Sequence, residues 1–495
     1  MLGRVATEAA ERFGDHIAYV SSGGWALSYR ELDRLADEVA VGLAERGVGD
    51  GDVVALVLPQ MPDYFVLYIA AARLGAITAG VNARLTAPER AQLLDIARPK
   101  VVVATEELAA PSAIIVEPDI ALDGVRVVGA SPPPLPDEDD PDRLVAFVFT
   151  SGTTGRPKAA TFANRQLDFI THVDTSDRWT APGAGGASFT GTSLAHLGPM
   201  SKLPGSLMRG GTTHLMARWR AADALRMLAE HRMSSVGGIP TQVALMLQDP
   251  DFDSYDLSSV RAIVVGGGPA TPALVREARE RFGAAVAVRY SCTEAGIGLG
   301  TAFDAPTEDA EVSVGRPHAG VELSLRDPDD PERRTVDDVG EVCLRSPAVM
   351  AGYWNEPALT AAAFTPDGFV RTGDLGWLDD AGRLRLVGRS KEMYVRGGYN
   401  VYPMEVEAVL AAHPSVADVA VAPRADDVMG EIGVAVVVPQ PGATAPTVDD
   451  LRTFAADRLA AYKLPEAIVV TAALPLTPME KLDRRALGDL VRNDA

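Results

Sequence analysis

One loop combines residue types that bind phosphate groups, and it reads Thr150-Ser151-Gly152-Thr153-Thr154-Gly155-Arg156-Pro157-Lys158. It follows the apolar run 144–149, which predicts a buried strand. Glycines let the backbone approach a ligand closely, hydroxyl side chains donate hydrogen bonds, and Lys158 adds a positive charge. These residues in this order therefore predict a loop that wraps a polyphosphate.

The loop differs from the P-loop of the common NTPases, because Lys158 follows a proline instead of a glycine. It resembles the phosphate loop of the AMP-forming adenylating enzymes, the superfamily of acyl-CoA synthetases, firefly luciferase and the adenylation domains of nonribosomal peptide synthetases. Stretches rich in serine, threonine and glycine are also typical of surface linkers. The interpretation therefore depends on the segments that follow.

A second segment resembles the aromatic-x-x-Thr-Glu motif of this superfamily, and it reads Tyr290-Ser291-Cys292-Thr293-Glu294. The resemblance implies that Tyr290 lies against adenine, that Thr293 meets the α-phosphate and that Glu294 holds Mg²⁺. A flat ring, a hydroxyl and a hard carboxylate suit Mg-ATP. The resemblance also assigns to the nucleotide site the flanking residues Ser291, Cys292, Gly267, Gly268 and Pro269.

Two further motifs resemble the ribose site and the hinge of the superfamily. The resemblance implies that Asp374, in the segment 371–376, accepts hydrogen bonds from both ribose hydroxyls, and that Arg389 makes the second ribose contact. It assigns Lys391 to the hinge. Gly397 and Gly398 would then lie along the pantetheine tunnel in the thioester-forming state. A bare Gly-Gly pair is usually only a hairpin turn, so this assignment depends on the surrounding segment 388–407.

The resemblance also places a catalytic lysine at Lys481, with Lys158 and Thr293 as its catalytic partners. A mobile ammonium can bridge the substrate carboxylate and the α-phosphate and so cancel the charge that keeps the two groups apart. Glu480 stands where the superfamily usually has a glycine. This departure affects the expected loop geometry and the expected rate.

The acyl pocket is predicted from fewer residues. His196 either lines the pocket or is a packed loop histidine, and Ala195 replaces the aromatic residue that relatives tend to have there. Thr241 and Gly266 are the other predicted pocket residues. The aspartate that pairs with an amino-acid substrate in amino-acid-activating relatives is not evident. A fatty, aromatic or cyclic acid is therefore expected.

Taken together, the resemblance implies an ATP-dependent, AMP-forming carboxylic acid–CoA ligase that forms an acyl-adenylate and then a thioester. ATP, Mg²⁺ and CoA are the implied cofactors. One alternative is a freestanding adenylation enzyme that loads an acyl carrier protein. Another is a nucleotide-binding relative with weakened catalysis, which Glu480 motivates.

Apolar runs that alternate with helical patterns predict the elements that position these residues. The fold class is α/β, with mostly parallel sheets flanked by helices. We expect a large N-terminal domain, residues 1–389, that binds ATP and acyl substrate and includes a smaller β subdomain. A small mobile α+β domain, residues 390–495, would carry Lys481.

Composition narrows the partners and the compartment. The 495 residues include 67 acidic and 46 basic side chains, a net charge of -21 that disfavours nucleic acid and anionic membranes as partners. Only Cys292 and Cys343 are present, which predicts a reducing cytoplasm. Prolines and charges interrupt the longest apolar stretch, 53–81, so no membrane span is expected. The N-terminal residues 1–15 carry charges within an amphipathic pattern, so no signal peptide is expected either. A homodimer is compatible with the sequence.

Overall fold

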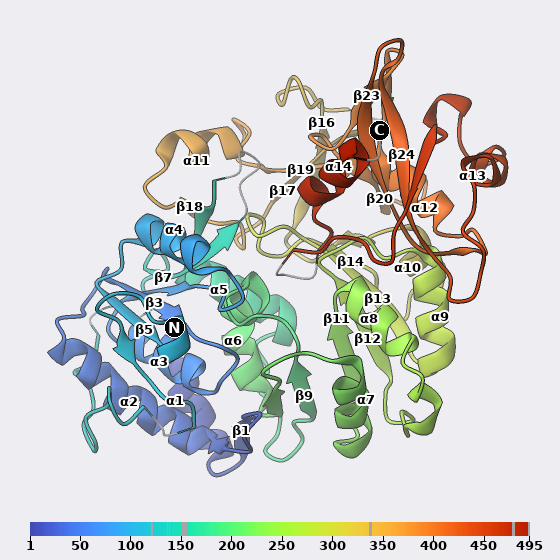
Figure 1. The fold of residues 1–495 in the computed structure, drawn as a ribbon. Helices are drawn as coiled ribbons and strands as arrows, with labels where there is room; N and C mark the ends of the chain where they lie inside the picture. Colours follow the sequence, from blue (N-terminus) through green and yellow to red (C-terminus); the bar gives the residue numbers. More distant parts are fainter. Residues whose placement is uncertain are drawn as a thin grey trace.

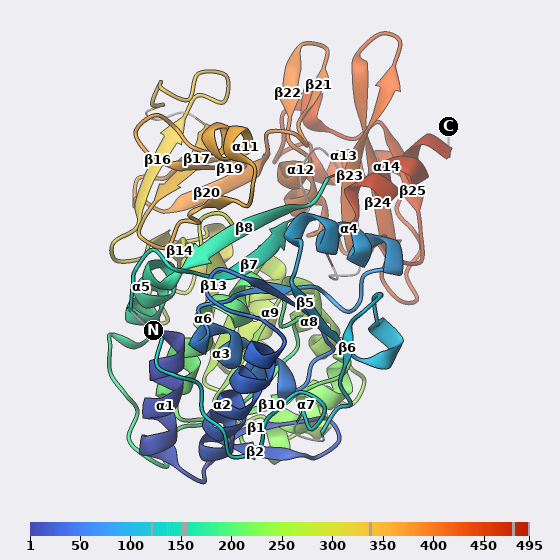
Figure 2. The same cartoon turned by 90° about the vertical axis from the view of Figure 1, so that its left-hand side faces the viewer.

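The computed structural model describes residues 1–119, 122–135, 137, 139–150, 156–335, 339–477 and 481–493. A large N-terminal part and a smaller C-terminal part make up the chain (Figures 1 and 2). In the described ranges, none of the helices has both the length and the apolar character needed to span a bilayer.

A seven-stranded sheet forms the first layer of the large part, in the order β18-β8-β7-β4-β3-β5-β6. Its central strands pair in parallel, while β8 and β18 run antiparallel to their neighbours. Their bounds are β3 (Val53–Val57), β4 (Ile77–Gly80), β5 (Val101–Ala104), β6 (Ile114–Ile115), β7 (Leu144–Thr150), β8 (Lys158–Ala163) and β18 (Gly352–Tyr353).

Amphipathic helices pack on this sheet and build the first core. Helix α2 shows the cause: Ser28 and Glu31 form a capping box at its start, and its apolar stripe is buried. The helices of this part are α1 (Leu2–Phe13), α2 (Tyr29–Glu45), α3 (Asp63–Arg73), α4 (Ala87–Ala97), α5 (Asn164–Thr175) and α6 (Leu197–Arg209). A four-stranded sheet beside them contains β1 (Ile17–Val20), β2 (Ala26–Ser28), β9 (Ala187–Thr190) and β10 (Thr212–Leu215).

A second sheet, in the order β11-β12-β13-β14-β15, carries helices on one face. Its strands β11, β12 and β13 pair in parallel, while β14 runs antiparallel to β13 and to β15. The helix face is apolar and packs against α7, α8 and α9. The elements are β11 (Ser235–Gly238), β12 (Ala262–Gly266), β13 (Ala285–Tyr290), β14 (Leu299–Gly300), β15 (Arg316–Pro317), α7 (Ala221–Glu230), α8 (Pro240–Leu247), α9 (Pro272–Phe282) and α10 (Asp309–Val312).

An antiparallel sheet and a C-terminal α+β unit lie beside each other at one end of the molecule (Figures 1 and 2). The sheet contains β16 (Glu322–Arg326), β17 (Gly340–Arg345), β19 (Val370–Leu378) and β20 (Leu384–Arg389), with α11 (Pro357–Ala363) nearby. The C-terminal unit contains β21 (Tyr394–Arg396), β22 (Tyr399–Val401), β23 (Val416–Asp426), β24 (Gly430–Pro439), β25 (Ala467–Val470), α12 (Pro403–Leu410), α13 (Val448–Ala455) and α14 (Arg484–Asn493). This architecture confirms the predicted fold class, while the boundary at residues 389 and 390 stays a prediction.

A buried carboxyl group at the start of α3 makes stability depend on pH. Asp63 is fully buried, and burial raises its pKa to about 7; the charge of Asp119 adds to the rise, while backbone N–H groups oppose it. The pKa of Asp63 is therefore higher in the folded protein than in the unfolded chain. The contribution of this carboxyl to the free energy of unfolding is fully present below about pH 4 and is lost as the pH rises through about 7.

We therefore expect Asp63→Asn to remove a stability loss of up to about 4 kcal/mol between these pH values. Thermal unfolding midpoints of both proteins at several pH values would measure the difference between their slopes. Identical slopes would show that Asp63 ionises in the folded protein as it does in the unfolded chain.

Candidate active site

Asp374 joins side chains from two sheets. The Tyr290 hydroxyl, at the end of β13, donates to Asp374 Oδ2 at 2.7 Å, and Arg389 Nε, at the end of β20, donates to Asp374 Oδ1 at 2.9 Å. Asp374 and Arg389 are also paired residues of the β19–β20 ladder. Burial and the neighbouring Asp374 charge raise the pKa of Tyr290, so its hydroxyl stays a donor. Three residues predicted to bind the nucleotide therefore meet at one point.

The backbone around Asp374 is held by polar contacts on both sides. Thr372 Oγ1 accepts from the Asp374 N–H at 3.1 Å and donates to the Val342 carbonyl at 2.8 Å. Gly373 has a φ of 74°, which suits glycine, and its N–H donates to Glu341 Oε1 at 3.1 Å. These contacts aim the Asp374 carboxylate at Tyr290 and Arg389.

Parallel strands bring the other predicted nucleotide and pocket residues to one edge. Strands β11, β12 and β13 pair in parallel, and their carboxyl ends lead into Thr241, into the segment 266–269 and into the segment 290–294. Ligands of α/β sheets commonly bind at this edge. Gly267, with a φ of 79°, turns the chain where β12 ends. Gly268 and Pro269 follow it, and Gly268 lies against Pro240 at the start of α8.

Glu294 contacts a tyrosine that the sequence analysis did not single out. The Tyr353 hydroxyl donates to Glu294 Oε1 at 2.7 Å, and the Lys158 ammonium lies 4.7 Å from the centre of the Tyr353 ring. Tyr353 belongs to β18, which pairs with β8 directly after Lys158. Tyr353 therefore links the predicted metal ligand to the lysine of the phosphate loop. Its short strand gives no periodic signal, so only the pairing reveals it.

We expect Tyr353→Phe to weaken Mg-ATP binding by about tenfold, because a hydrogen bond to a charged group is worth about 1.5–3 kcal/mol. Titration calorimetry with ATP, with and without Mg²⁺, measures the effect apart from turnover. Tyr353→Leu should cost more, since it also removes the ring under Lys158, and Tyr255→Phe serves as the matched control. Unchanged affinity in Tyr353→Phe would remove Tyr353 from the site.

Lys481 reaches this site from the C-terminal unit. Its ammonium interacts electrostatically with Arg389, Asp374 and His196. Lys481 keeps contact with solvent, yet desolvation and the Arg389 charge lower its pKa, while Asp374 opposes the shift. Burial, Lys481 and Arg84 lower the pKa of His196 to about 4, so this imidazole is neutral at pH 7. Lys481 thus acts electrostatically on residues of both the predicted ribose site and the predicted acyl site.

Residues on either side of the segment 478–480 contact each other. The Thr477 N–H donates to the Lys481 carbonyl at 2.7 Å, and Leu476 pairs with Leu482 as an isolated bridge. Residues 478–480, with Glu480, lie outside the described residues. The phosphate-loop residues Ser151, Gly152, Thr153, Thr154 and Gly155 also lie outside them, whereas Thr150 and Lys158 pair across the ends of β7 and β8.

The structure does not bring the Gly-Gly pair to the predicted nucleotide site. Gly397 and Gly398, with φ values of 55° and 85°, form the exposed turn between β21 and β22. This hairpin projects away from the large part of the molecule in Figure 2. Lys391 is exposed between the two parts. Lys481 and the Gly-Gly turn therefore face different surroundings in this arrangement.

Two residues between Tyr290 and Thr293 have internal roles in the motif. Ser291 Oγ donates to the carbonyls of Cys292 and Gly296 and so braces the turn. Burial, then the charges of Glu294 and Asp374, raises the pKa of the Cys292 thiol. A protonated thiol is a poor nucleophile, so we do not expect Cys292 to react as a nucleophile.

The residues predicted to bind the nucleotide meet at the edges of two sheets, and the C-terminal unit supplies the predicted catalytic lysine, an arrangement expected of an adenylate-forming enzyme. The AMP-binding enzyme family matches residues 6–354, and the AMP-binding enzyme C-terminal domain matches residues 405–481. The chain therefore belongs to the AMP-binding enzyme family, within the superfamily of AMP-forming adenylating enzymes.

Individual relatives cover nearly the whole chain. A fatty acid–[acyl-carrier-protein] ligase, ScoC, from Streptomyces coeruleorubidus is 31% identical over 95% of this chain and 93% of its own length. A feruloyl-CoA synthase from Amycolatopsis is 32% identical over 95% of both chains. The structure of the amide bond synthetase McbA from Marinactinospora thermotolerans superposes with a TM-score of 0.87, at 26% identity, over 99% of this chain and 100% of that one.

Proposed function

We propose that the protein is an AMP-forming carboxylic acid–CoA ligase. The observation that carries the proposal is the convergence of Tyr290, Asp374 and Arg389 with Lys481, which the C-terminal unit supplies next to His196. The whole-length similarity to ligases that act on fatty and aromatic acids supports it. A fatty, aromatic or cyclic acid is the substrate class that we propose on this basis.

In the first half-reaction, a carboxylate oxygen of the acid attacks the α-phosphorus of ATP. A P–O bond forms to the acid, the bond to the pyrophosphate oxygen breaks, and pyrophosphate leaves. Asp374 and Arg389 would hold the ribose, and Lys481 would neutralise the attacking and α-phosphate oxygens. Lys158 and the loop 151–155 would hold the departing pyrophosphate. Positioning and charge stabilisation account for the catalysis.

Glu294 fits a Mg²⁺ ion bound together with the nucleotide. Mg²⁺ usually takes one or two protein carboxylates and completes its shell with phosphate oxygens and water. Glu294 offers such a carboxylate next to Lys158, and Tyr353 fixes one of its oxygens. The ion, when bound, neutralises charge on the phosphates. The residues of this chain orient the nucleotide around it.

In the second half-reaction, the CoA sulfur attacks the acyl carbonyl, the thioester forms and AMP leaves with the electron pair of the cleaved bond. We propose that the unit 390–495 rotates about Lys391 against the unit 1–389 between the two steps. The rotation would withdraw Lys481 and bring Gly397 and Gly398 to the site. One site would thus serve both half-reactions.

Lys391→Pro should separate the two half-reactions, because proline restricts the backbone torsion that a hinge needs. We expect acid-dependent pyrophosphate exchange near the wild-type rate and thioester formation reduced by at least about tenfold. Assays of pyrophosphate exchange and of thioester formation, run in parallel, measure the ratio of the two activities. Arg485→Ala, in the same unit, serves as the control variant and should leave both activities unchanged. An equal loss of both activities would contradict a hinge at Lys391.

An acyl carrier protein is the second candidate acceptor, because a fatty acid–[acyl-carrier-protein] ligase is among the similar proteins. A screen of AMP release over a panel of carboxylic acids, with CoA or a phosphopantetheine-bearing carrier protein as acceptor, tests both. Release that depends on an acid and CoA supports the proposal; release only with the carrier protein overturns the CoA assignment.

Free thiols at Cys292 and Cys343 fit the cytoplasmic location that we propose.

A further inference from the structure

The face of the second sheet that points away from helices α7–α9 carries mostly small residues. The side chains of Val236, Ile263, Val265, Val286 and Val288 face the helices α7–α9. Because side chains alternate along a strand, the opposite face carries their neighbours in register: Gly237, Val264, Gly266, Ala287 and Arg289. Gly266 is a predicted acyl-pocket residue, and Arg289 is its direct partner on β13. Arg289 is the one ionisable residue in this row.

The Arg289 guanidinium keeps one edge unused. Its Nη1 donates to the carbonyls of Thr301 and Val288, at 2.6 and 3.1 Å. Within the described part of the chain, its Nε and Nη2 bond no acceptor and no carboxylate forms an ion pair with it. Nε and Nη2 form the edge with which arginine grips a carboxylate through two parallel hydrogen bonds. A half-buried arginine with that edge open is prepared for an anion.

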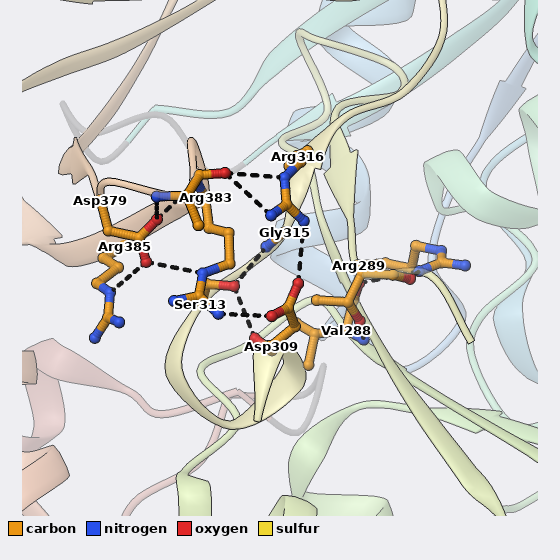
Figure 3. A network of polar contacts seen from close by, with 11 residues as sticks. Val288, Arg289, Asp309, Ser313, Gly315, Arg316, Asp379, Arg383 and Arg385 are labelled. Atoms are coloured by element: carbon orange, nitrogen blue, oxygen red, sulfur yellow. Dashed lines mark hydrogen bonds and ion pairs between the residues drawn. The ribbon is translucent and has the colours of Figure 1, made fainter. Parts of the chain in front are cut away.

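The ion-pair network around Asp309 and Asp379 does not supply that anion. Asp309 pairs with Arg316 at 3.0 Å and with Arg383 at 2.6 Å, and Asp379 pairs with Arg383. Figure 3 shows the Arg289 side chain extending away from this network. Instead the guanidinium lies against β14, where a Cβ at Gly300 would be 2.7 Å from Arg289 Nη1 and 3.1 Å from His318 Nε2.

Helix α6 carries further positive charge. On α6, Lys202 and Arg209 share a single carboxylate, Asp174 of α5, at 3.5 and 3.6 Å. Electrostatic interactions connect Asp174 to Arg289, and connect His318 to Arg289 and Lys202. Lys202 and Arg209 thus share one carboxylate, whose charge also acts on Arg289, in a chain whose overall charge is -21. The excess positive charge suits a ligand with an anionic group.

The same helix α6 connects this cluster to the predicted acyl site. His196 precedes α6 directly, and Lys202 lies in its second turn. Between them, a Cβ at Gly198 would meet no atom within 4 Å, and one at Gly237 on the second sheet would meet only the Val264 carbonyl, at 3.9 Å. Both glycines are exposed, so no side chain fills the space beside them at these two positions.

We propose that the acid activated by this enzyme is a dicarboxylic acid, whose second carboxylate binds the open edge of Arg289, with Lys202 adding positive charge. The inference rests on the proposed function, since it assigns the far end of the acyl pocket. An acid without a second anionic group would leave the guanidinium edge desolvated and without a partner. An unpaired buried polar group costs binding free energy, so the enzyme should discriminate strongly against such acids. A phosphonate or sulfonate shares the anionic chemistry, so the test must separate these groups.

The test compares each dicarboxylic acid with its own monomethyl ester in ATP–pyrophosphate exchange, over aliphatic chains of increasing length and terephthalate. For the best diacid we expect kcat/KM to exceed that of its ester by about 100-fold. Arg289→Gln should bring this ratio near one by raising KM for the diacid, Arg289→Lys should restore part of it, and Arg276→Gln on α9 should leave it unchanged. Thermal unfolding and ATP binding check that each variant folds.

The outcomes separate the two levels of the proposal. Exchange that is equal for esters and diacids, or a diacid preference that survives in Arg289→Gln, overturns the inference and leaves the ligase proposal standing. Exchange with no acid of any kind overturns both. A terminal phosphonate or sulfonate that outperforms the matching diacid, in an Arg289-dependent way, overturns the dicarboxylate assignment.

Discussion

Lys481→Ala is expected to reduce acid-dependent ATP–pyrophosphate exchange by about 10²–10³-fold, the usual loss when one preorganised group that stabilises charge is removed. The reason is its position: Lys481 interacts with Asp374 and Arg389 on the nucleotide side and with His196 on the acyl side. Its loss leaves the attacking carboxylate and the α-phosphate to repel each other. The exchange assay at saturating ATP measures kcat for this half-reaction.

Thioester formation from a synthetic acyl-adenylate provides the internal control. If the C-terminal unit rotates, Lys481 is withdrawn during that step, so Lys481→Ala should form thioester from acyl-adenylate at close to the wild-type rate. Arg485→Ala removes an exposed positive charge from the same unit and should leave both steps unchanged. Equal losses in both half-reactions would show that Lys481 supports the fold instead of the adenylation step.

Asp374→Asn should raise KM for ATP by about 10–100-fold. The substitution keeps the size of the side chain and removes the carboxylate that Tyr290 and Arg389 contact at 2.7 and 2.9 Å. An amide accepts weaker hydrogen bonds from the ribose hydroxyls than a carboxylate does, and a hydrogen bond to a charged group is worth about 1.5–3 kcal/mol. Because the ribose is bound in both ground and transition states, the loss should appear mainly in KM.

Direct ATP binding separates this effect from turnover. Asp380→Asn, in the exposed turn after β19, is a matched control that should bind ATP normally. Tyr290→Phe should reproduce part of the Asp374 effect, because it removes one of the two donors. Normal ATP affinity in Asp374→Asn would mean that the ribose lies elsewhere.

Much of the nucleotide site was predictable because its residues stand in short, characteristic segments. The aromatic-x-x-Thr-Glu segment and the Arg-Thr-Gly-Asp segment can be read locally, and the structure brings Tyr290 and Asp374 together. The alternation of strands and helices likewise predicted the α/β class. In each case the information lies within a few consecutive residues or a regular period.

The residues that sequence reasoning missed depend on contacts between distant segments. Tyr353 reaches Glu294 only because β18 pairs with β8, and the isolated Gly-Tyr pair carries no pattern. Arg289 stands next to the recognised Tyr290, but its direction depends on the register of β12, β13 and β14. The raised pKa of Asp63 depends on burial by elements from elsewhere in the chain. Such positions follow from tertiary packing, which a single sequence does not display.

The central claim is that distant segments meet around one nucleotide to adenylate an acid. The most direct measurement is mass spectrometry of the purified enzyme incubated with ATP, Mg²⁺ and a carboxylic acid, without any thiol acceptor. We predict an acyl-adenylate together with an equal amount of pyrophosphate, both formed about 10²–10³-fold more slowly by Lys481→Ala. ADP and phosphate as the products, or unchanged ATP with every acid tried, would contradict the account.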